Sequence, residues 1–256
     1  MNRESAILPL LLNELRLSTM KRLWEDVSVE ARGNSWSNAR YLATLCEYEI
    51  AERLKRRLSK RMSEAQLPKA KSLESYDFAV IKGVSKSQVL GLASGDMWIK
   101  EGMNILIFGP SGVGKTHLAA AVGEKLVENG LRVLFSRTTE LVQRLQAAKR
   151  SLALPAALDK LDKYDCLILD DFGYVQKDEF ETSVLFELIC CRYERKSMLI
   201  TCNQPFKEWE NIFVNRQMAV AAIDRVVHKA FILEIEAESY RKKQALERVR
   251  NKTVKI

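Results

Sequence analysis

The sequence lacks the features that mark membrane-spanning, secreted, disulfide-bonded and zinc-binding proteins. No window offers about 18 consecutive apolar residues, which a membrane-spanning helix needs. The N-terminal stretch MNRESAILPLLLNELRL has a short apolar patch followed at once by acidic and basic residues, unlike a secretory signal. The five cysteines form no C-x-x-C pair, and three of them lie in apolar runs. We therefore expect a cytoplasmic protein, without membrane contact, in which Cys46, Cys166, Cys190, Cys191 and Cys202 are reduced.

Acidic residues are fewer than basic ones, and the imbalance is uneven along the chain. The formal net charge is +8. Residues 1–75 and 241–256 carry the basic excess, whereas residues 76–240 are close to neutral. A polyanion touched by both ends would explain this distribution, but so would a basic surface that only keeps the protein soluble.

The first 66 residues have the pattern of a small all-helical domain. Leucines recur at helical spacing near the start, GNSWSN at 33–38 indicates a break, and residues 39–62 predict a second helix. The polar side of that helix carries six candidate DNA-binding residues, namely Arg53, Lys55, Arg56, Arg57, Lys60 and Arg61. Residues 67–78, which include a proline and small polar residues, are interpreted as a linker.

From residue 100 onward, short apolar runs alternate with amphipathic stretches. Strands are predicted at 104–109, 132–137, 166–172, 197–203 and 231–236, and helices near 115–129, 138–150, 178–195 and 216–229. This alternation predicts an α/β fold in which a parallel five-stranded sheet lies between helices.

A phosphate-binding loop is predicted directly after the first of these strands. GPSGVGKT fits G-x-x-x-x-G-K-[ST], follows a predicted strand and opens a predicted helix. Glycines let backbone N–H groups point at phosphate oxygens, and the helix N-terminus adds positive charge. Lys115 is expected to reach the β- and γ-phosphates, and Thr116 to bind Mg²⁺. The expected nucleotide-binding residues are Gly109, Pro110, Ser111, Gly112, Val113, Gly114, Lys115, Thr116 and His117.

The apolar strand CLILDD ends in two carboxylates, Asp170 and Asp171. A carboxylate at the C-terminal end of a strand that faces the loop can hold Mg²⁺, and we assign this role to Asp170. Asp171 would orient or deprotonate the attacking water. Either residue could instead simply begin a turn.

Three further residues are candidates for the reaction. Asn203 ends a predicted strand; if that strand lies between the first and third, its amide would position the water. Arg225 precedes the last strand, where it could reach a neighbouring subunit's nucleotide and stabilise the charge of phosphoryl transfer. Arg241 is a candidate contact to the γ-phosphate. The alternatives are a strand end for Asn203, a salt bridge to Asp224 for Arg225 and a solvated tail for Arg241.

The two histidines are weaker candidates. His117 follows the loop threonine, where packing or capping is a more usual role than catalysis. His228 lies on an apolar helix face without a metal-ligand set around it.

These segments together resemble the IstB-like transposition helper ATPases, which are AAA+ proteins similar to the DnaC-type helicase loaders. The resemblance covers about residues 1–245, and RYERKSMLITCNQPFKEW and the IDR, H and ESYR ending are its most specific parts. Cys202 stands where a serine is usual and Ala237 where a glycine is usual.

The resemblance implies an AAA+ ATPase domain over 79–245 behind the helical domain of 1–66, with a basic tail at 246–256. It implies ATP and Mg²⁺ as cofactors, a homo-oligomer on duplex DNA, and a cognate transposase as partner. No short recognition motif such as a zinc finger is visible, so we expect DNA binding with little sequence preference. By motif, Asn203 becomes the first sensor, Arg225 the arginine finger and Arg241 the second sensor.

Three functions were weighed. A transposition helper agrees best with the basic ends and the resemblance, and a replicative helicase loader is the alternative. A small-molecule kinase with the same loop should carry an arginine-rich lid, but Arg132, Arg137, Arg144 and Arg150 are spread out.

Overall fold

The computed structural model describes residues 3–94, 97–173, 179–204, 208–209 and 215–240. The chain divides into two compact units, Met1–Lys60 and Arg61–Ile256, which are described separately below. The predicted domain boundaries at 66, 78 and 245 stay predictions. The observed division follows Lys60, within the helix that the sequence predicts at 39–62. No helix in the described part of the chain is long and apolar enough to cross a membrane.

The first unit is helical, as predicted. Helices α1 (Arg3–Glu14) and α2 (Ser18–Gly33) precede α3 (Asn38–Ala65), whose last turns belong to the second unit. The break at 34–37 matches the predicted one. A second break, between α1 and α2, was not predicted because no glycine or proline marks it; there Arg16 adopts a left-handed backbone with φ of 57°. In the described part of this unit, four buried apolar residues form a core cluster: Leu12, Met20, Val27 and Leu45.

A buried carboxylate joins α2 to α3 within this unit. Glu49 accepts hydrogen bonds from the backbone N–H groups of Thr19 and Met20, at 2.7 and 3.1 Å. Its other oxygen accepts from Arg53 Nε at 2.8 Å. Burial raises the pKa of Glu49, but these hydrogen bonds outweigh it and leave the pKa below its ordinary value. The ionised carboxylate therefore satisfies two N–H groups that α2 cannot satisfy by itself.

The second unit contains the predicted parallel sheet. Its strands are β1 (Asn104–Phe108), β2 (Val133–Arg137), β3 (Cys166–Asp170), β4 (Ser197–Cys202) and β5 (Ala230–Glu234). In the described residues they pair in the order β2-β3-β4-β1-β5, all parallel. Each lies where an apolar run predicted a strand, so the α/β prediction is confirmed. Since β4 lies between β3 and β1, Asn203 follows the strand that its predicted role requires.

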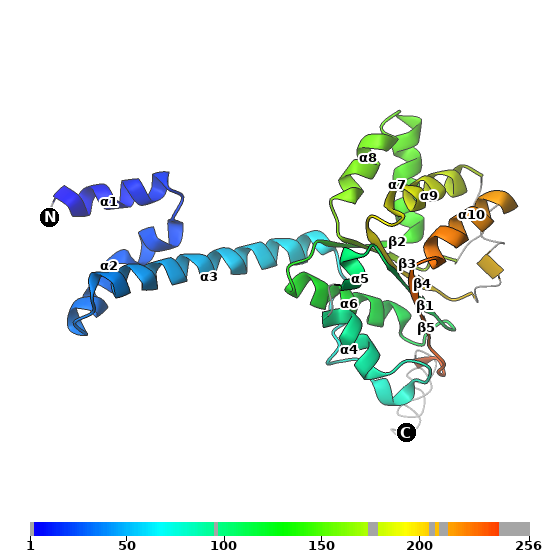
Figure 1. The fold of residues 1–256 in the computed structure, drawn as a ribbon, viewed down its shortest axis with the longest axis horizontal. Coiled ribbons are helices and arrows are strands. Elements are labelled where there is room, and N and C mark those ends of the chain that lie inside the picture. Colours follow the sequence, from blue (N-terminus) through cyan, green and yellow to red (C-terminus); the bar gives the residue numbers. More distant parts are fainter. Residues whose placement is uncertain (1–2, 95–96, 174–178, 205–207, 210–214, 241–256) are drawn as a thin grey trace, which may run out of the picture. The chain divides into compact units, whose positions relative to one another are not determined.

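Helices cover both faces of this sheet (Figure 1). Alternate side chains of β1 enter different cores, as a buried strand requires. Ile105 and Ile107 pack in one core with α6 (Lys115–Glu128), α4 (Lys86–Ser94) and α5 (Met97–Lys100). Leu106 and Phe108 pack in the other. That second core includes α7 (Thr138–Arg150), α8 (Leu154–Asp162), α9 (Glu179–Arg192) and α10 (Arg216–Val227).

The segment interpreted as a linker is packed onto the second unit. Leu73 and Tyr76 are buried in the core that contains α6, and the short 3₁₀ helix η1 (Phe78–Val80) follows. Glu74 forms an ion pair with Lys125 of α6 at 3.2 Å. We call residues 71–77 the strap. Its polar residues are typical of a spacer, but its apolar residues hold it against α6 of the second unit.

Candidate nucleotide-binding site

The phosphate-binding loop connects β1 to α6 and has the backbone that its glycines predict. Gly112 and Gly114 have φ of 87° and 99°, in the left-handed region, and Gly114 caps the N-terminus of α6. A side chain at Gly114 would also approach the ring of Tyr76 to 3.0 Å. Glycine is therefore needed at position 114 for two reasons: its left-handed backbone conformation and the close approach of Tyr76.

The loop lysine is buried and held across the loop. Lys115 is 6% exposed, and its Nζ donates hydrogen bonds to the carbonyl oxygens of Gly109 at 2.7 Å and Pro110 at 2.8 Å. A buried ammonium is costly unless it is hydrogen-bonded. The loop thus holds a cation at the N-terminal end of α6, where phosphate groups are also favoured by the helix dipole.

Asp170 gathers two hydroxyl groups at the end of β3. Thr116 Oγ1 donates to both carboxylate oxygens, at 2.9 and 3.1 Å, and Thr201 Oγ1 donates to Oδ1 at 2.6 Å. Asp170 is 3% exposed. A hydroxyl and a carboxylate in contact beside a phosphate loop are the oxygen donors that Mg²⁺ prefers, so these residues fit the ion. No local motif singles out Thr201, because its contact with Asp170 depends on the pairing of β3 with β4.

Asp171 and Asn203 lie at the same edge of the sheet and line the same cavity. The backbone N–H of Asp171 donates to Thr201 Oγ1 at 3.0 Å, and its φ is 54°. Asn203 Oδ1 is buried without a hydrogen-bond partner in the described part of the chain. Buried amide oxygens are normally satisfied, so this one is available to accept a hydrogen bond from a group that enters the cavity.

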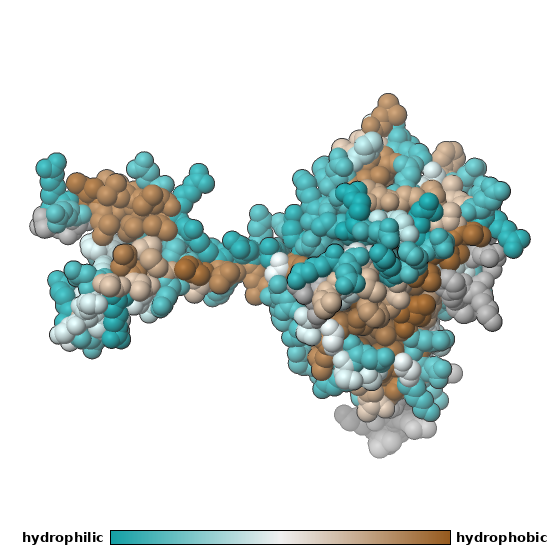
Figure 2. Space-filling view, viewed as in Figure 1, coloured by the Kyte–Doolittle hydropathy of each residue, from teal (hydrophilic) through white to brown (hydrophobic). Residues whose placement is uncertain are grey.

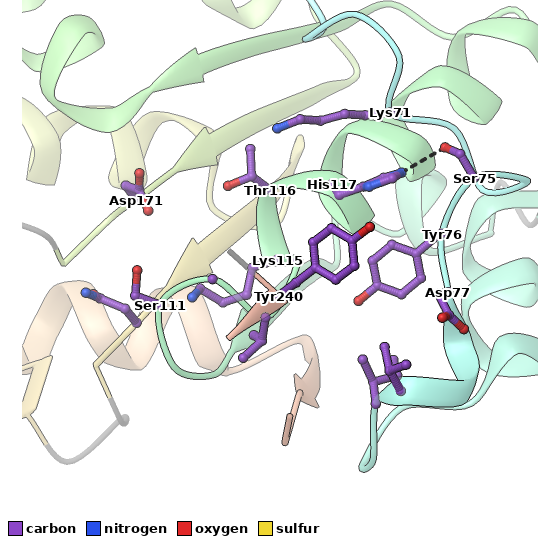
Figure 3. Close-up of a pocket in the computed structure, with 16 residues that line it drawn as sticks. Lys71, Ser75, Tyr76, Asp77, Ser111, Lys115, Thr116, His117, Asp171 and Tyr240 are labelled. Carbon is purple, nitrogen blue, oxygen red and sulfur yellow. Dashed lines mark hydrogen bonds between the residues drawn. The ribbon is translucent and has the colours of Figure 1, made fainter. Parts of the chain in front are cut away.

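The cavity has a volume of about 450 Å³ and lies between the loop and the strap (Figure 3). Besides Ser111, Val113 and the other loop residues, it is lined by Lys71, Tyr76 and Asp77 of the strap and by Val80 and Ile81. Sequence reasoning missed this second wall. The available signal was the spacing of Leu73, Tyr76 and Phe78 in KSLESYDF, which has more apolar character than a free linker would have.

Tyr76 is the largest side chain of this wall. Its ring meets His117 edge-on at 5.1 Å and Phe78 at 4.8 Å between ring centres. Burial raises the pKa of Tyr76 to about 12, and its hydroxyl has no partner in the described residues. The hydroxyl therefore stays protonated at neutral pH and can donate a hydrogen bond into the cavity.

His117 connects the loop helix to the strap. Its Nε2 lies 2.9 Å from the carbonyl oxygen of Ser72 and 3.2 Å from Ser75 Oγ. The ring also lines the cavity. These contacts are the kind of packing that its position after Thr116 suggested.

Arg225 does not line this cavity. It lies on α10 beside an open depression that Arg216 and Asp224 share. Its Nη1 donates to the carbonyl oxygen of Ala221 at 2.7 Å, and the guanidinium lies 5.5 Å from the ring centre of Phe186. Arg225 is thus not among the residues that line the cavity beside the phosphate-binding loop. Arg241, the other predicted arginine, lies outside the described residues.

The six predicted DNA-binding residues are not equivalent. Arg53 Nη2 donates to the carbonyl oxygen of Arg16 at 2.7 Å, and Arg56 Nη1 to Ser18 Oγ at 3.0 Å, so both brace the junction between α1 and α2. Arg61 donates to the carbonyl oxygen of Gly130 within the second unit. Lys60 makes further interactions. In the described part of the chain, Lys55 and Arg57 are exposed and make no hydrogen bond or ion pair.

Comparison with known sequences identifies relatives over nearly the whole chain. The model of the IstB-like ATP binding protein family matches residues 10–248. An insertion sequence ATP-binding protein of Sinorhizobium fredii is 53% identical over 249 residues, which cover 97% of this chain and 84% of that protein. The ATP-binding protein of insertion sequence IS21 from Pseudomonas aeruginosa is 35% identical over 237 residues, which cover 93% and 89%.

Solved structures share the fold of the second unit. The DnaC helicase loader superposes with a TM-score of 0.53 at 23% identity, over 65% of this chain and 97% of that one. DnaA from Aquifex aeolicus, bound to AMPPCP, superposes with a TM-score of 0.56 at 20% identity, over 73% of this chain and 56% of that one. These likenesses confirm an AAA+ P-loop fold.

Proposed function

This chain belongs to the family of IstB-like ATP binding proteins, and from that premise we propose that it is an ATPase switch for insertion-sequence transposition. In this proposal it binds ATP and Mg²⁺, assembles as a homo-oligomer on duplex DNA, and recruits or activates the cognate transposase. Hydrolysis of ATP ends that state and is slow unless DNA or the partner stimulates it.

The arrangement of Thr116 and Asp170 carries the proposal. Their contact, at 2.9 and 3.1 Å, joins the phosphate loop to the end of β3 beneath a cavity of about 450 Å³. A chance glycine-rich turn would not combine a buried loop lysine, this hydroxyl–carboxylate pair and the orphaned amide oxygen of Asn203.

Each residue then has a definite task in phosphoryl transfer. Lys115 would exchange its two loop carbonyls for oxygens of the β- and γ-phosphates, while Thr116 and Asp170 would hold Mg²⁺. Bound Mg²⁺ would neutralise phosphate charge at this edge of the sheet. Asp171 accepts a proton from the attacking water, or orients it, and Asn203 fixes its direction.

Arg225 completes the site of a neighbouring subunit in this proposal. The support is its exclusion from its own cavity together with its place on α10 beside an open depression. Arg225→Ala should then bind ATP normally and lose DNA-stimulated hydrolysis. Arg195→Ala, which removes another arginine of the second unit, is the control.

Mixing two inactive variants tests this arrangement. Lys115→Ala protein supplies an intact arginine and Arg225→Ala protein an intact loop, so one kind of mixed interface should hydrolyse ATP. If no mixing ratio restores activity, Arg225 does not act across an interface.

The main experiment measures assembly and hydrolysis in the same samples. Duplex DNA is mixed with the protein and ATP, ADP or a slowly hydrolysed analogue, and complexes are followed by gel shift and negative-stain imaging. Asp171→Asn should keep ATP binding, slow hydrolysis and prolong the DNA complexes. Complexes that form equally with all nucleotides and without nucleotide would contradict a switch.

A helicase loader is the second candidate, because the DnaC loader shares the fold. That likeness covers 65% of the chain, whereas the insertion-sequence relative of Sinorhizobium fredii aligns over 97%. Co-purification with the transposase encoded beside the gene favours the helper, and co-purification with the replicative helicase favours the loader.

A further inference from the structure

A lysine of the strap faces the phosphate loop across the cavity. Lys71 lines the same cavity as Lys115 and Thr116. In Figure 3 its side chain extends from the strap, with the ammonium on the side of Thr116. In the described part of the chain, Lys71 forms neither a hydrogen bond nor an ion pair. An unpaired cation here has the position of a ligand-binding group.

The residues that follow Lys71 are held against the helix that starts at the phosphate-binding loop. The carbonyl oxygen of the next residue, Ser72, lies 2.9 Å from His117 Nε2 and accepts a hydrogen bond from Ser75 Oγ at 3.0 Å. Leu73 is buried against α6. His117 itself follows Thr116, so the strap is fastened to the first turn of the helix that starts at the loop. Lys71 is thereby kept near the phosphate site and does not depend on a mobile segment to reach it.

Charge in the cavity favours a phosphate ligand for this ammonium. Asp77 and Asp171 also line the cavity, and Asp170 lies beneath it. A nucleoside triphosphate brings several more negative charges, and Lys115 alone comes from the loop. A second ammonium reduces the repulsion between these groups, and lysine is a common point-charge partner of phosphate.

We propose that Lys71 is a second phosphate-binding cation, which contacts the phosphates of a nucleoside di- or triphosphate from the strap side. This inference rests on the proposed function as an ATP-binding protein. The strap then binds the nucleotide directly: the phosphates contact Lys115 of the loop on one side and Lys71 of the strap on the other.

Affinities for ATP, ADP and AMP test the proposal in the full-length protein. Lys71→Met removes the charge and keeps an unbranched side chain of similar length. Its dissociation constant for ATP should rise about tenfold, and that for ADP should rise less, because charge-assisted hydrogen bonds are lost. Binding of AMP should change less than twofold, since no β- or γ-phosphate is present. Lys71→Arg should keep most of the ATP affinity.

Lys69→Met is the matched control. It removes the same charge two residues earlier, from an exposed lysine that does not line the cavity, and should leave all three affinities unchanged. Equal weakening of ATP and AMP binding by Lys71→Met, or unchanged binding of all three, would overturn the proposal.

The result also separates this inference from the proposed function. If wild-type protein binds ATP, Lys115→Ala does not, and Lys71→Met binds like wild type, only the role of Lys71 is wrong. If wild-type protein binds no nucleotide, the proposed function and this inference both fail.

Discussion

The two units bury their apolar residues to very different extents. The second unit encloses its sheet between two extensive cores, and the described strands β1, β3 and β4 are buried along their whole length. Among the described residues, the core cluster of the first unit holds four buried apolar residues, whereas Ile7, Leu10 and Leu11 of α1 and the following Leu15 are exposed. Figure 2 shows these apolar side chains gathered on the surface of α1.

This difference separates the tasks of the two units. A well-packed sheet can hold Lys115, Asp170 and Asn203 at fixed distances, which phosphoryl transfer requires. A thin core contributes less stabilisation, because hydrophobic stabilisation grows with the apolar area buried. We expect the first unit to unfold more easily, and four changes test this comparison.

The largest effect is expected at Arg192 in the second unit. Its guanidinium is 1% exposed and donates to the carbonyl oxygens of Leu161, Tyr164 and Ser197 at 3.1, 3.1 and 2.8 Å. Burial lowers its pKa to about 10. Arg192→Leu removes these three hydrogen bonds from a buried site and should cost about 3 kcal/mol. Thermal unfolding by calorimetry measures this loss.

Arg195→Leu is the control for that experiment. Arg195 is exposed and forms an ion pair with Asp162, so its loss should cost about 0.5 kcal/mol or less. If both variants unfold at the same temperature, the hydrogen bonds of Arg192 do not stabilise the second unit.

Next in size is the loss of the loop cation. Lys115→Ala should weaken ATP binding by about 100-fold, because a buried charge-assisted contact to two phosphates disappears. Isothermal titration calorimetry measures the affinity. The unfolding of the first unit should not change. If the variant binds ATP as tightly as the wild type does, the loop is not part of the nucleotide-binding site.

A smaller effect is expected at Glu49 in the first unit. Glu49→Gln weakens the hydrogen bonds to Thr19, Met20 and Arg53, and should cost about 1–2 kcal/mol. The loss of stability is measured by following the helicity of the full-length protein during a urea titration. Glu47→Gln, on an exposed position of the same helix, should have almost no effect.

The contribution of Glu49 should also depend on pH. Since its folded-state pKa lies below the ordinary value of 4.5, the stabilisation is complete above about pH 4.5. It is lost as the pH falls through the folded-state pKa. The stability difference between wild type and Glu49→Gln should therefore shrink in acid, and a constant difference would exclude an ionised Glu49.

The smallest effect is expected from the two unpaired cations of α3. Lys55→Ala with Arg57→Ala should weaken binding of every duplex alike and reduce the slope of log affinity against log salt by about two units. Arg53→Ala serves as the contrast, because it should also destabilise the first unit. An unchanged slope would place the DNA contact on another surface.

Local sequence patterns predicted the strands and the phosphate-binding loop of the site, whereas the residues that long-range packing brings to it were not predicted. The strand before Gly109 and the strand that ends at Asp170 are continuous apolar runs, so their type and order could be read directly. Helix α8 was not predicted, because it spans only Leu154–Asp162 and so short an apolar stretch is interpreted as part of the loop between α7 and β3. Thr201 and Tyr76 reach the site only through strand pairing and through the strap, which no short spacing encodes.

The left-handed backbone at Asp171 bears on which amino acids the position can tolerate. Asparagine, aspartate and glycine accept a φ of 54° more readily than other residues, and β-branched residues accept it least. A library of variants at 171 that is screened only for folding should therefore return glycine, asparagine and aspartate together. The same library screened for turnover of ATP should retain aspartate alone, so the two screens separate what the backbone demands from what the chemistry demands.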